Sequence, residues 1–401
     1  MAQTSTPRRA LVSGGSIAGL SAAYWLALDG WQVTLVERAP GFRDGGQNVD
    51  VRGVGHEVLD RMGLVETIRA LGTGETGTVA VDEDDRVVAI FPDVGPDSAT
   101  AELEVLRGDL ARAIHDVLPA DVEVRYDETV SEVVDLGGTV RVTTTRRPAE
   151  EVDLLVVAEG VRSTTRDLVL DGGDVELRPL GIDMVFGTIP RLESDDTRWR
   201  WMTTTGGRQA HLRPDGRGGT RAILSFAPSR QVSDLDPAAR QALLEERYAG
   251  VGWAVPRILR GLATSHDVYA DSLTQVRART WHRGRAVLVG DAAWCVTPLG
   301  GGGATLALTS GYVLAAQLSR ATDVPAALER FEAWMRPLVD DVQTLPPGLD
   351  RLAYPRTALG LRASRTVTRL VTSRLLRPIA ARATQVAHTD QELPRLEPSS
   401  A

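Results

Sequence analysis

A glycine-rich stretch near the start of the chain has the residue types and spacing that a diphosphate group requires. Residues 14–19 read GGSIAG, and Glu37 follows about twenty residues after the turn. In such a stretch the glycines allow a tight turn, a close approach of the backbone to a pyrophosphate, and packing of a helix on a strand. The unpaired N–H groups and the dipole at the start of that helix then favour an anion.

Two residues refine this prediction. Glu37 ends an apolar run, where its carboxylate can accept both ribose hydroxyls of an adenosine and disfavours a 2′-phosphate. Ser16 occupies the middle glycine site, where its side chain crowds the closest phosphate approach but can still donate a hydrogen bond. We predict an ADP-containing ligand, against the alternative of an ordinary glycine-rich turn. The predicted nucleotide-binding residues are Gly14, Gly15, Ser16, Ile17, Ala18, Gly19, Glu37 and Arg38.

The elements around the turn read as strand, turn, helix and strand. An apolar run at residues 10–12 precedes it, an apolar-periodic stretch continues to Asp29 and Gly30, and a second apolar run occupies residues 33–36. Residues 152–158 form a nearly continuous apolar run, which is typical of a buried parallel strand, and residues 285–289 form another. We therefore predict an α/β fold with a Rossmann-like nucleotide-binding domain.

A different pattern occupies the middle of the chain. Between residues 177 and 227, short alternating runs are separated by Gly, Asp and Pro, which favours a mostly antiparallel sheet inserted as a substrate domain. We assign residues 1–75, 101–175 and 277–345 to the nucleotide-binding domain, residues 76–100 and 176–276 to the substrate domain, and residues 346–401 to C-terminal helices. Residues 41–53 are predicted to be a surface loop, and residues 55–72 a single amphipathic helix.

Composition limits the function classes. The chain has 401 residues, a net charge of −8 and one cysteine, Cys295. An intrachain disulfide and a thiolate metal cluster are therefore excluded, and nucleic acid is an unfavoured partner. No signal peptide and no long apolar stretch are visible, so we expect a cytoplasmic protein without a membrane partner, as a monomer or homodimer. The acidic residues 82–85 are expected to be a solvated turn rather than a metal site, and no metal site is predicted.

Several motifs in order resemble the single-component FAD-dependent aromatic monooxygenases, the para-hydroxybenzoate hydroxylase-like (group A) family. They are the turn at residues 14–19 with Glu37 and Arg38, Arg107 before a helix, the segment AEG at 158–160 with Ser163 and Arg166, and the segment GDAA at 290–293 followed by Pro298 and four glycines. The resemblance covers about residues 8–345. It implies the two-part GR2-type fold, with FAD bound non-covalently.

The resemblance adds residues to the cofactor site. It implies that Arg107 lies near the diphosphate or ribityl chain, with a surface salt bridge as the alternative. Asp291 would accept hydrogen bonds from the ribityl hydroxyls, unless it merely caps a turn. The start of the helix at residues 304–318 would face the flavin and stabilise its reduced, anionic form, unless the glycines form a flexible loop. Flavin contacts are assigned to Gly303, Ala304, Thr305, Val130 and Arg52.

Three positions depart from the family pattern. Ser16 replaces a glycine, Glu159 replaces the usual aspartate of the second motif, and Trp294 stands where many members have histidine. The longer reach of Glu159 puts its role at the nucleotide surface in doubt. We favour plain packing for Trp294 over stacking on a substrate.

The implied reaction consumes NAD(P)H and O2. Only one dinucleotide fingerprint is present, so NAD(P)H would dock transiently, and a C4a-hydroperoxyflavin would insert one oxygen atom into an aromatic or polycyclic small molecule. Arg52, His211 and Arg213 are the predicted catalytic residues: Arg52 beside the isoalloxazine, the other two orienting or deprotonating a phenol. The alternatives are an exposed loop charge for Arg52 and a solvent-facing pair for His211 and Arg213.

Other classes fit less well. An FAD-dependent dehydrogenase or reductase would keep the fold without oxygen transfer, and it is our main alternative. A flavin halogenase lacks support because Trp199-Arg200-Trp201 continues as Met202-Thr203-Thr204. A flavin-binding redox sensor would need no substrate domain, and a plain NAD-dependent dehydrogenase would purify colourless.

Overall fold

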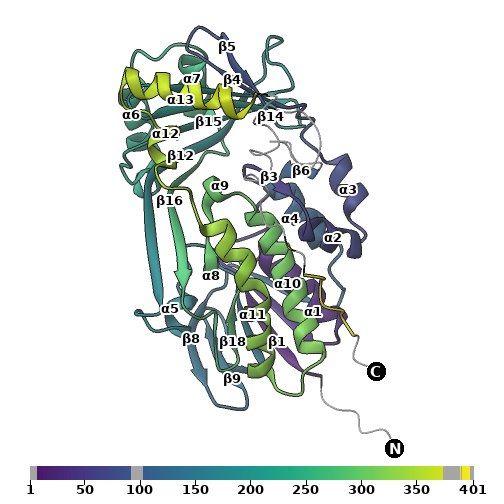
Figure 1. Cartoon of the computed structure of the whole chain (residues 1–401). Helices are drawn as coiled ribbons and strands as arrows, with labels where there is room; N and C mark the ends of the chain where they lie inside the picture. Colours follow the sequence, from purple (N-terminus) through teal and green to yellow (C-terminus); the bar gives the residue numbers. More distant parts are fainter. Residues whose placement is uncertain (1–6, 92–102, 374–388, 390, 398–401) are drawn as a thin grey trace, which may run out of the picture.

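The computed structural model describes residues 7–91, 103–373, 389 and 391–397 (Figure 1). A six-stranded sheet forms its lower part in that view. Five of its strands are parallel, and an antiparallel edge strand closes one side. In spatial order they are β17 (His282–Arg283), β18 (Ala286–Leu288), β11 (Leu154–Val157), β1 (Arg9–Ser13), β2 (Gln32–Glu37) and β7 (Glu123–Tyr126). The predicted α/β domain is thus present, with β1 at its centre.

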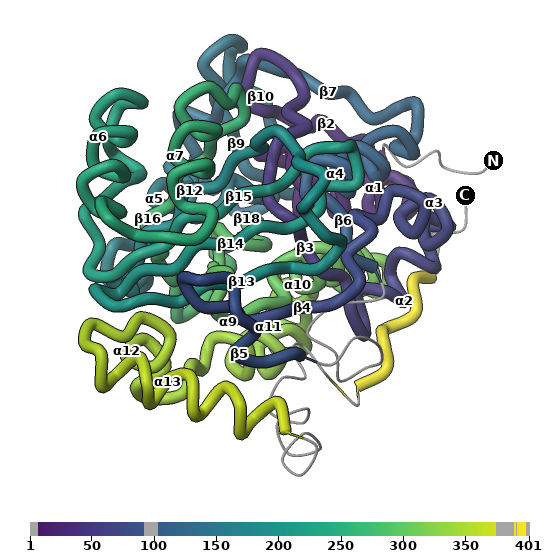
Figure 2. The backbone as a smooth tube through the Cα atoms, turned by 90° about the horizontal axis from the view of Figure 1, so that it is seen from above, coloured from purple at the N-terminus to yellow at the C-terminus, as the bar shows by residue number. Residues whose placement is uncertain are grey.

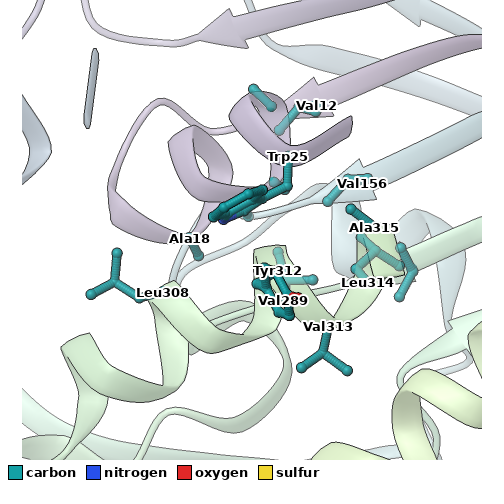
Figure 3. Packing of buried hydrophobic residues seen from close by; sticks show 14 of the residues in the cluster. Val12, Ala18, Trp25, Val156, Val289, Leu308, Tyr312, Val313, Leu314 and Ala315 are labelled. Atoms are coloured by element: carbon teal, nitrogen blue, oxygen red, sulfur yellow. The ribbon is translucent and has the colours of Figure 1, made fainter. Parts of the chain in front are cut away.

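Two helices cover one face of this sheet at close range. Helix α1 (Ile17–Leu28) packs on α10 (Gly303–Ser319), and Trp25 meets Tyr312 edge to face with ring centroids 4.9 Å apart (Figure 3). Gly311 permits this approach, because a Cβ there would lie 2.5 Å from the Ala22 nitrogen. The long helix α11 (Val324–Gln343) covers α10 from outside. The start of α10 is therefore held at a fixed place relative to the turn before α1.

Smaller elements complete the lower part. They are α4 (Arg107–Asp116), α5 (Thr165–Val169), α8 (Asp291–Trp294), α9 (Thr297–Gly300), and the antiparallel strands β8 (Val130–Asp135), β9 (Val140–Thr144) and β10 (Glu150–Val152). The prediction of a single helix over residues 55–72 is wrong. The chain forms α2 (Val54–Arg61) and α3 (Val65–Ala70), because Gly63 between them takes a left-handed φ of 69°.

The loop predicted at residues 41–53 also contains regular structure. Its residues Asn48–Val51 form β3, which pairs antiparallel with β6 (Leu103–Leu106). The burial pattern of β3 carries little alternation, since only Val51 is fully buried. The partner strand lies more than fifty residues away in sequence, so local pattern could not reveal the pairing.

A seven-stranded sheet forms the upper part. Its strands, in spatial order, are β16 (Tyr269–Ala278), β12 (Val175–Pro190), β15 (Gly219–Phe226), β14 (Arg208–Pro214), β13 (Trp199–Thr204), β4 (Thr78–Val81) and β5 (Val87–Ile90). All neighbouring pairs are antiparallel except β13 with β4. The predicted antiparallel sheet is therefore present. Strands β12 and β16 run down from it beside the lower part (Figure 1).

The two faces of this sheet have different partners. Helices α6 (Pro237–Arg247) and α7 (Val255–Thr264) lie over one face (Figure 2), where Ala210 and Leu212 join their apolar core. The 3-10 helix η1 (Val232–Asp234) also lies near β16 and β12. Side chains of the alternate positions, such as His211 and Arg213, point from the opposite face.

The C-terminal region joins the upper sheet. Helices α12 (Leu349–Ala353) and α13 (Ala358–Val371) follow, and Tyr354 between them is buried against Met184, Phe186 and Ile223. The Tyr354 hydroxyl lies 2.5 Å from Ser225 Oγ. The predicted helix beyond residue 373 falls outside the described residues. None of the helices in the described parts of the chain has the length and hydropathy needed to cross a membrane.

Candidate active site

The glycine-rich turn adopts the geometry expected for diphosphate binding. Gly14 has a φ of 111°, and a Cβ there would overlap the carbonyl oxygen of Ala158. A Cβ on Gly19 would overlap the carbonyl oxygen of Gly14. The turn is therefore too tight for side chains at these two positions, and the N-terminus of α1 lies open behind Ser16. Ile17 and Ala18 are buried in the first turn of α1.

Glu37 lies beside this turn at the end of β2. Its two carboxylate oxygens accept hydrogen bonds from the backbone N–H groups of Gly15 (2.8 Å) and Ala39 (2.9 Å). A carboxylate has about four acceptor positions, so each oxygen can still accept one hydroxyl. This arrangement fits a ribose at Glu37, while Arg38 next to it is exposed.

Ser16 and Arg107 contact each other directly. The Arg107 guanidinium donates to Ser16 Oγ at 3.0 Å, and the Arg107 N–H donates to the Gln47 carbonyl at 2.9 Å. The arginine therefore extends over the turn rather than into solvent, and a surface salt bridge does not describe it. The serine hydroxyl keeps its own proton for a phosphate oxygen. The substitution of the middle glycine is thus matched by a cation placed at the same point.

Asp291 approaches the same turn from the third motif. Gly290 before it packs on Ala18, since a Cβ on Gly290 would lie 2.8 Å from the Ala18 Cβ. Asp291 is exposed, yet burial raises the pKa of its carboxyl and Arg107 opposes the rise. A ligand bound at the turn would meet this carboxylate and Arg107 together.

The start of α10 is fastened to the end of β3. The Arg52 N–H donates to Thr305 Oγ1 at 3.0 Å, and Gly55 packs on the Thr305 Cα. The Thr305 side chain is fully buried and turned toward Arg52, so any cofactor contact of Gly303, Ala304 and Thr305 would come from their backbone. The Arg52 side chain donates to Asp50 at 3.4 Å and is only 23% exposed. It is not an exposed loop charge.

Aromatic rings gather on the open face of the upper sheet. Trp199 and Trp201 of β13 are stacked 5.5 Å apart, and Trp201 stacks on His211 of β14 at 5.0 Å. The Trp199 indole N–H donates to His211 Nδ1 (3.0 Å), and His211 Nε2 faces Gln209 Oε1 (3.2 Å). Burial, with a smaller contribution from Arg213, lowers the pKa of His211 to about 3. The ring is therefore neutral, with its proton on Nε2.

This geometry bears on His211 and Arg213, two of the three predicted catalytic residues. His211 is buried, and both its nitrogens have protein partners, which leaves no lone pair for a substrate proton. Arg213 is stacked over Trp199 at 4.1 Å and paired with Glu75 and Glu104, each at 2.8 Å. The pair does lie on one face of the strand, but the solvent-facing alternative is wrong. We therefore do not assign His211 the role of proton acceptor.

Comparison with known proteins identifies the family of this chain. It matches the FAD binding domain family over residues 8–343. The flavin-dependent monooxygenase eupH of a Phoma species is 31% identical over 392 residues, which span 90% of this chain and 91% of that protein. This chain belongs to the family of FAD-dependent monooxygenases. The resemblance found in the sequence motifs and the FAD cofactor are thereby confirmed.

Other similar proteins support this assignment of the chain, called the monooxygenase from here on. An uncharacterised protein of Mycobacterium tuberculosis is 36% identical over 322 residues, covering 78% of the monooxygenase and 85% of that protein. The structure of tetracycline destructase Tet(55) superposes with a TM-score of 0.79 at 27% identity, covering 97% and 99% of the two chains. HpxO of Klebsiella pneumoniae, solved with FAD and uric acid, has the same fold at 22% identity and a TM-score of 0.78.

Glu159 has a structural task in the monooxygenase. Its carboxylate accepts hydrogen bonds from the hydroxyls of Ser13 (2.5 Å), Ser163 (2.7 Å) and Thr165 (2.5 Å) and from the Thr165 N–H (3.1 Å). All of these donors belong to β1 or to the start of α5. The longer side chain therefore reaches inward, which answers the doubt about this departure. Arg166, also buried, donates to the carbonyls of Val161 and Ala292 and holds α8 in place.

Trp294 and Val130 are core residues. Trp294 is 1% exposed and packs on Trp281 at 4.3 Å, which supports packing over substrate stacking. Val130 is buried at the start of β8. A cavity of about 310 Å³ lies beside Trp281 and Trp294, but none of the predicted cofactor residues lines it. We regard the region around Asp291 as the site, because the charged and glycine residues converge there.

Sequence reasoning missed several residues around the aromatic face. Gln209 shares the alternation of His211 and Arg213, so the two-residue period could have found it. Glu75, Glu104 and Tyr354 come from distant segments and are brought together only by the fold. In the parts of the chain that the structure describes, no group of His, Cys, Asp or Glu side chains is arranged to hold a metal ion.

Proposed function

We propose that this monooxygenase uses NAD(P)H to insert one oxygen atom of O2 into an aromatic or polycyclic small molecule. One observation supports this most directly: a series of contacts links the start of α10 to the sheet face that carries the stacked aromatic rings. Thr305 of α10 contacts Arg52, which pairs with Asp50 of β3. Asp50 lies opposite Glu104 of β6, and Glu104 pairs with Arg213 on that face.

FAD would be held without a covalent bond. Glu37 would accept the ribose hydroxyls, Ser16 and Arg107 would meet the diphosphate, and Asp291 would accept from the ribityl chain. The tight turn at Gly14 supports this assignment, because it leaves the helix N-terminus open to an anion. Cys295 is buried and neutral, since burial raises the pKa of its thiol well above the usual range.

The flavin supplies the redox chemistry, accepting a hydride from NAD(P)H and activating oxygen. The protein supplies position and charge. The first backbone N–H groups of any α-helix have no carbonyl acceptor within the helix. At the start of α10 these groups would stabilise negative charge on the bound ring. With one dinucleotide fingerprint in the sequence, NAD(P)H would bind transiently at the flavin site rather than in a domain of its own.

The division into domains is part of the proposal. Residues 1–75, 101–175 and 277–345 would bind FAD, and residues 76–100 and 176–276 would bind substrate. The upper sheet supports this, because β4 and β5 join strands of the later segment. The C-terminal segment from residue 346 would contribute to the substrate domain through Tyr354. The likeness to tetracycline destructase favours a polycyclic substrate within the aromatic class.

The test is oxygen incorporation by the purified, FAD-loaded protein. Phenolic and polycyclic compounds would be screened for faster NAD(P)H-dependent flavin reduction under anaerobic conditions, and products would be analysed after turnover in labelled oxygen. We expect one labelled atom per product molecule. Substrate turnover without label would move the protein to the alternative of an FAD-dependent dehydrogenase or reductase. The Arg107→Ala variant serves as the control that lacks a cofactor contact.

A further inference from the structure

The aromatic face ends at a single guanidinium. Trp199, Trp201 and Phe91 have nearly parallel rings, with interplanar angles of 9°, and Arg213 lies over Trp199. All three rings are partly exposed, so each leaves apolar ring surface for a ligand. The charge available to a substrate on this face therefore depends on what Arg213 already binds.

One edge of the Arg213 guanidinium is bound by two protein carboxyl groups. Its Nε donates to Glu75 Oε2 and its terminal nitrogen to Glu104 Oε1, both at 2.8 Å. The Arg213 side chain is 10% exposed, while those of Glu75 and Glu104 are 0% and 5% exposed. Glu104 is itself fixed by Thr73 (2.9 Å) and Asn48 (2.7 Å). The Nε and Nη2 edge of the guanidinium, which could pair with a substrate carboxylate, is occupied by Glu75 and Glu104.

The neighbouring charges balance. Asp50 pairs with Arg52, and Glu104 pairs with Arg213. Burial raises the pKa of Glu75 to about 8, with Glu104 and Asp50 adding to the rise and Arg213 opposing it. Glu75 is therefore mostly protonated at neutral pH, and His211 is neutral as well. The group as a whole carries almost no net charge at neutral pH and becomes negative when Glu75 ionises.

Resting on the proposed function, we propose that Glu75 and Glu104 determine substrate specificity. Glu104 neutralises Arg213, and Glu75 occupies the same edge of its guanidinium, so the aromatic face accepts an uncharged planar ring and rejects a ring that carries a carboxylate. A bound carboxylate would lose its hydration without gaining a free cation and would face Glu104 and Asp50 nearby. Rejection by unpaired like charge is a common source of specificity.

The test compares two probes on the FAD-loaded protein, 2-naphthol and 6-hydroxy-2-naphthoate. Their dissociation constants would be measured from the change in flavin absorbance at about pH 7. We expect 2-naphthol to bind at least about tenfold more tightly. In the Glu75→Gln/Glu104→Gln variant Arg213 keeps its charge but loses the carboxylate that neutralises it, so the ratio should fall by at least about fivefold. Glu66→Gln, at an exposed pair with Arg69, is the matched control and should leave the ratio unchanged.

A pH series tests the same inference with a milder change. Between about pH 7 and pH 9, binding of the carboxylate to the wild type should weaken further as Glu75 ionises. Glu75→Gln should abolish that dependence. This single variant decides the matter if the double variant does not fold.

Equal or tighter binding of the carboxylate to the wild type would overturn the inference. So would an unchanged ratio in the double variant, or failure of both probes to bind a preparation whose flavin is reduced by NAD(P)H. A preparation that holds FAD but is not reduced by NAD(P)H with any substrate would instead defeat the proposed function. The two failures are therefore distinguishable.

Discussion

The glycine-rich turn and the aromatic face of the upper sheet are built in opposite ways. The turn comes from residues within one short segment, and Gly14, Gly19 and Glu37 meet because a strand, a helix and a strand follow each other directly. The aromatic face draws on β13, β14 and β6 and on the segment after α3. Its key contact, between Arg213 and Glu75, joins residues 138 positions apart.

The difference explains how each region tolerates change. Close backbone packing at the turn leaves no room for an added atom, so a single methyl group should be severe. The aromatic face depends on charges and hydrogen bonds that several residues share, so single changes there should shift equilibria by smaller amounts. Variants in the two regions can therefore be ranked before any measurement.

The largest effect is expected from Gly19→Ala. The new Cβ would overlap the Gly14 carbonyl oxygen, so the turn must open and both stability and FAD binding should suffer by more than about 3 kcal/mol. Gly138→Ala is the matched control, because no atom lies within 4 Å of a Cβ there. Thermal unfolding and the flavin-to-protein absorbance ratio measure the two losses. Normal flavin content in Gly19→Ala would show that the turn does not bind the cofactor as described.

The next largest effects are expected at Glu159 and Asp291, the acids of the second and third sequence motifs. Glu159→Ala leaves four buried or partly buried donors without an acceptor, so the free energy of unfolding should fall by about 3 kcal/mol. Asp291→Ala should instead weaken FAD affinity by about 2 kcal/mol and leave the apoprotein stable. Chemical denaturation of the apoprotein and titration with FAD separate these outcomes. Equal losses of FAD affinity in the two variants would contradict the division of roles.

The sequence predicted what depends on local spacing. Residues 10–38 specify the turn and its flanking strands through glycine positions and apolar periods, and the structure contains them with nearly the same bounds. The helix break at Gly63 was missed because a single glycine inside an apolar period does not reveal its φ. The pairing of β3 with β6, and the carboxylates around Arg213, depend on contacts between distant segments. No local pattern carries that information.

The Ser16–Arg107 contact gives the third prediction. Arg107→Ala should weaken FAD affinity by about 1.5–3 kcal/mol, the range of a lost charge-assisted hydrogen bond. Ser16→Ala should cost about 1 kcal/mol, and the double variant should cost less than the sum, because the two side chains support each other. Reconstitution of apoprotein with FAD measures each value. Strict additivity would mean that the two residues contact the cofactor independently.

The smallest effect concerns His211 and the pH dependence of stability. Burial lowers the folded-state pKa of His211 to about 3, below the ordinary value of 6.5, so the unfolded chain takes up the proton first. The stability linked to this residue is present above about pH 6.5 and is lost as the pH falls toward 3. At about pH 5.5 the loss amounts to about 1.4 kcal/mol. His211→Gln removes the titration, so the difference in free energy of unfolding between wild type and variant should shrink by that amount between about pH 7.5 and pH 5.5. Denaturant unfolding at the two pH values measures it, with His266→Gln, at an exposed histidine, as the control. A difference that stays constant would mean that His211 can take up a proton in the folded protein. The neutral ring between Trp199 and Gln209 would then have to rearrange, and the role of proton acceptor would return to His211.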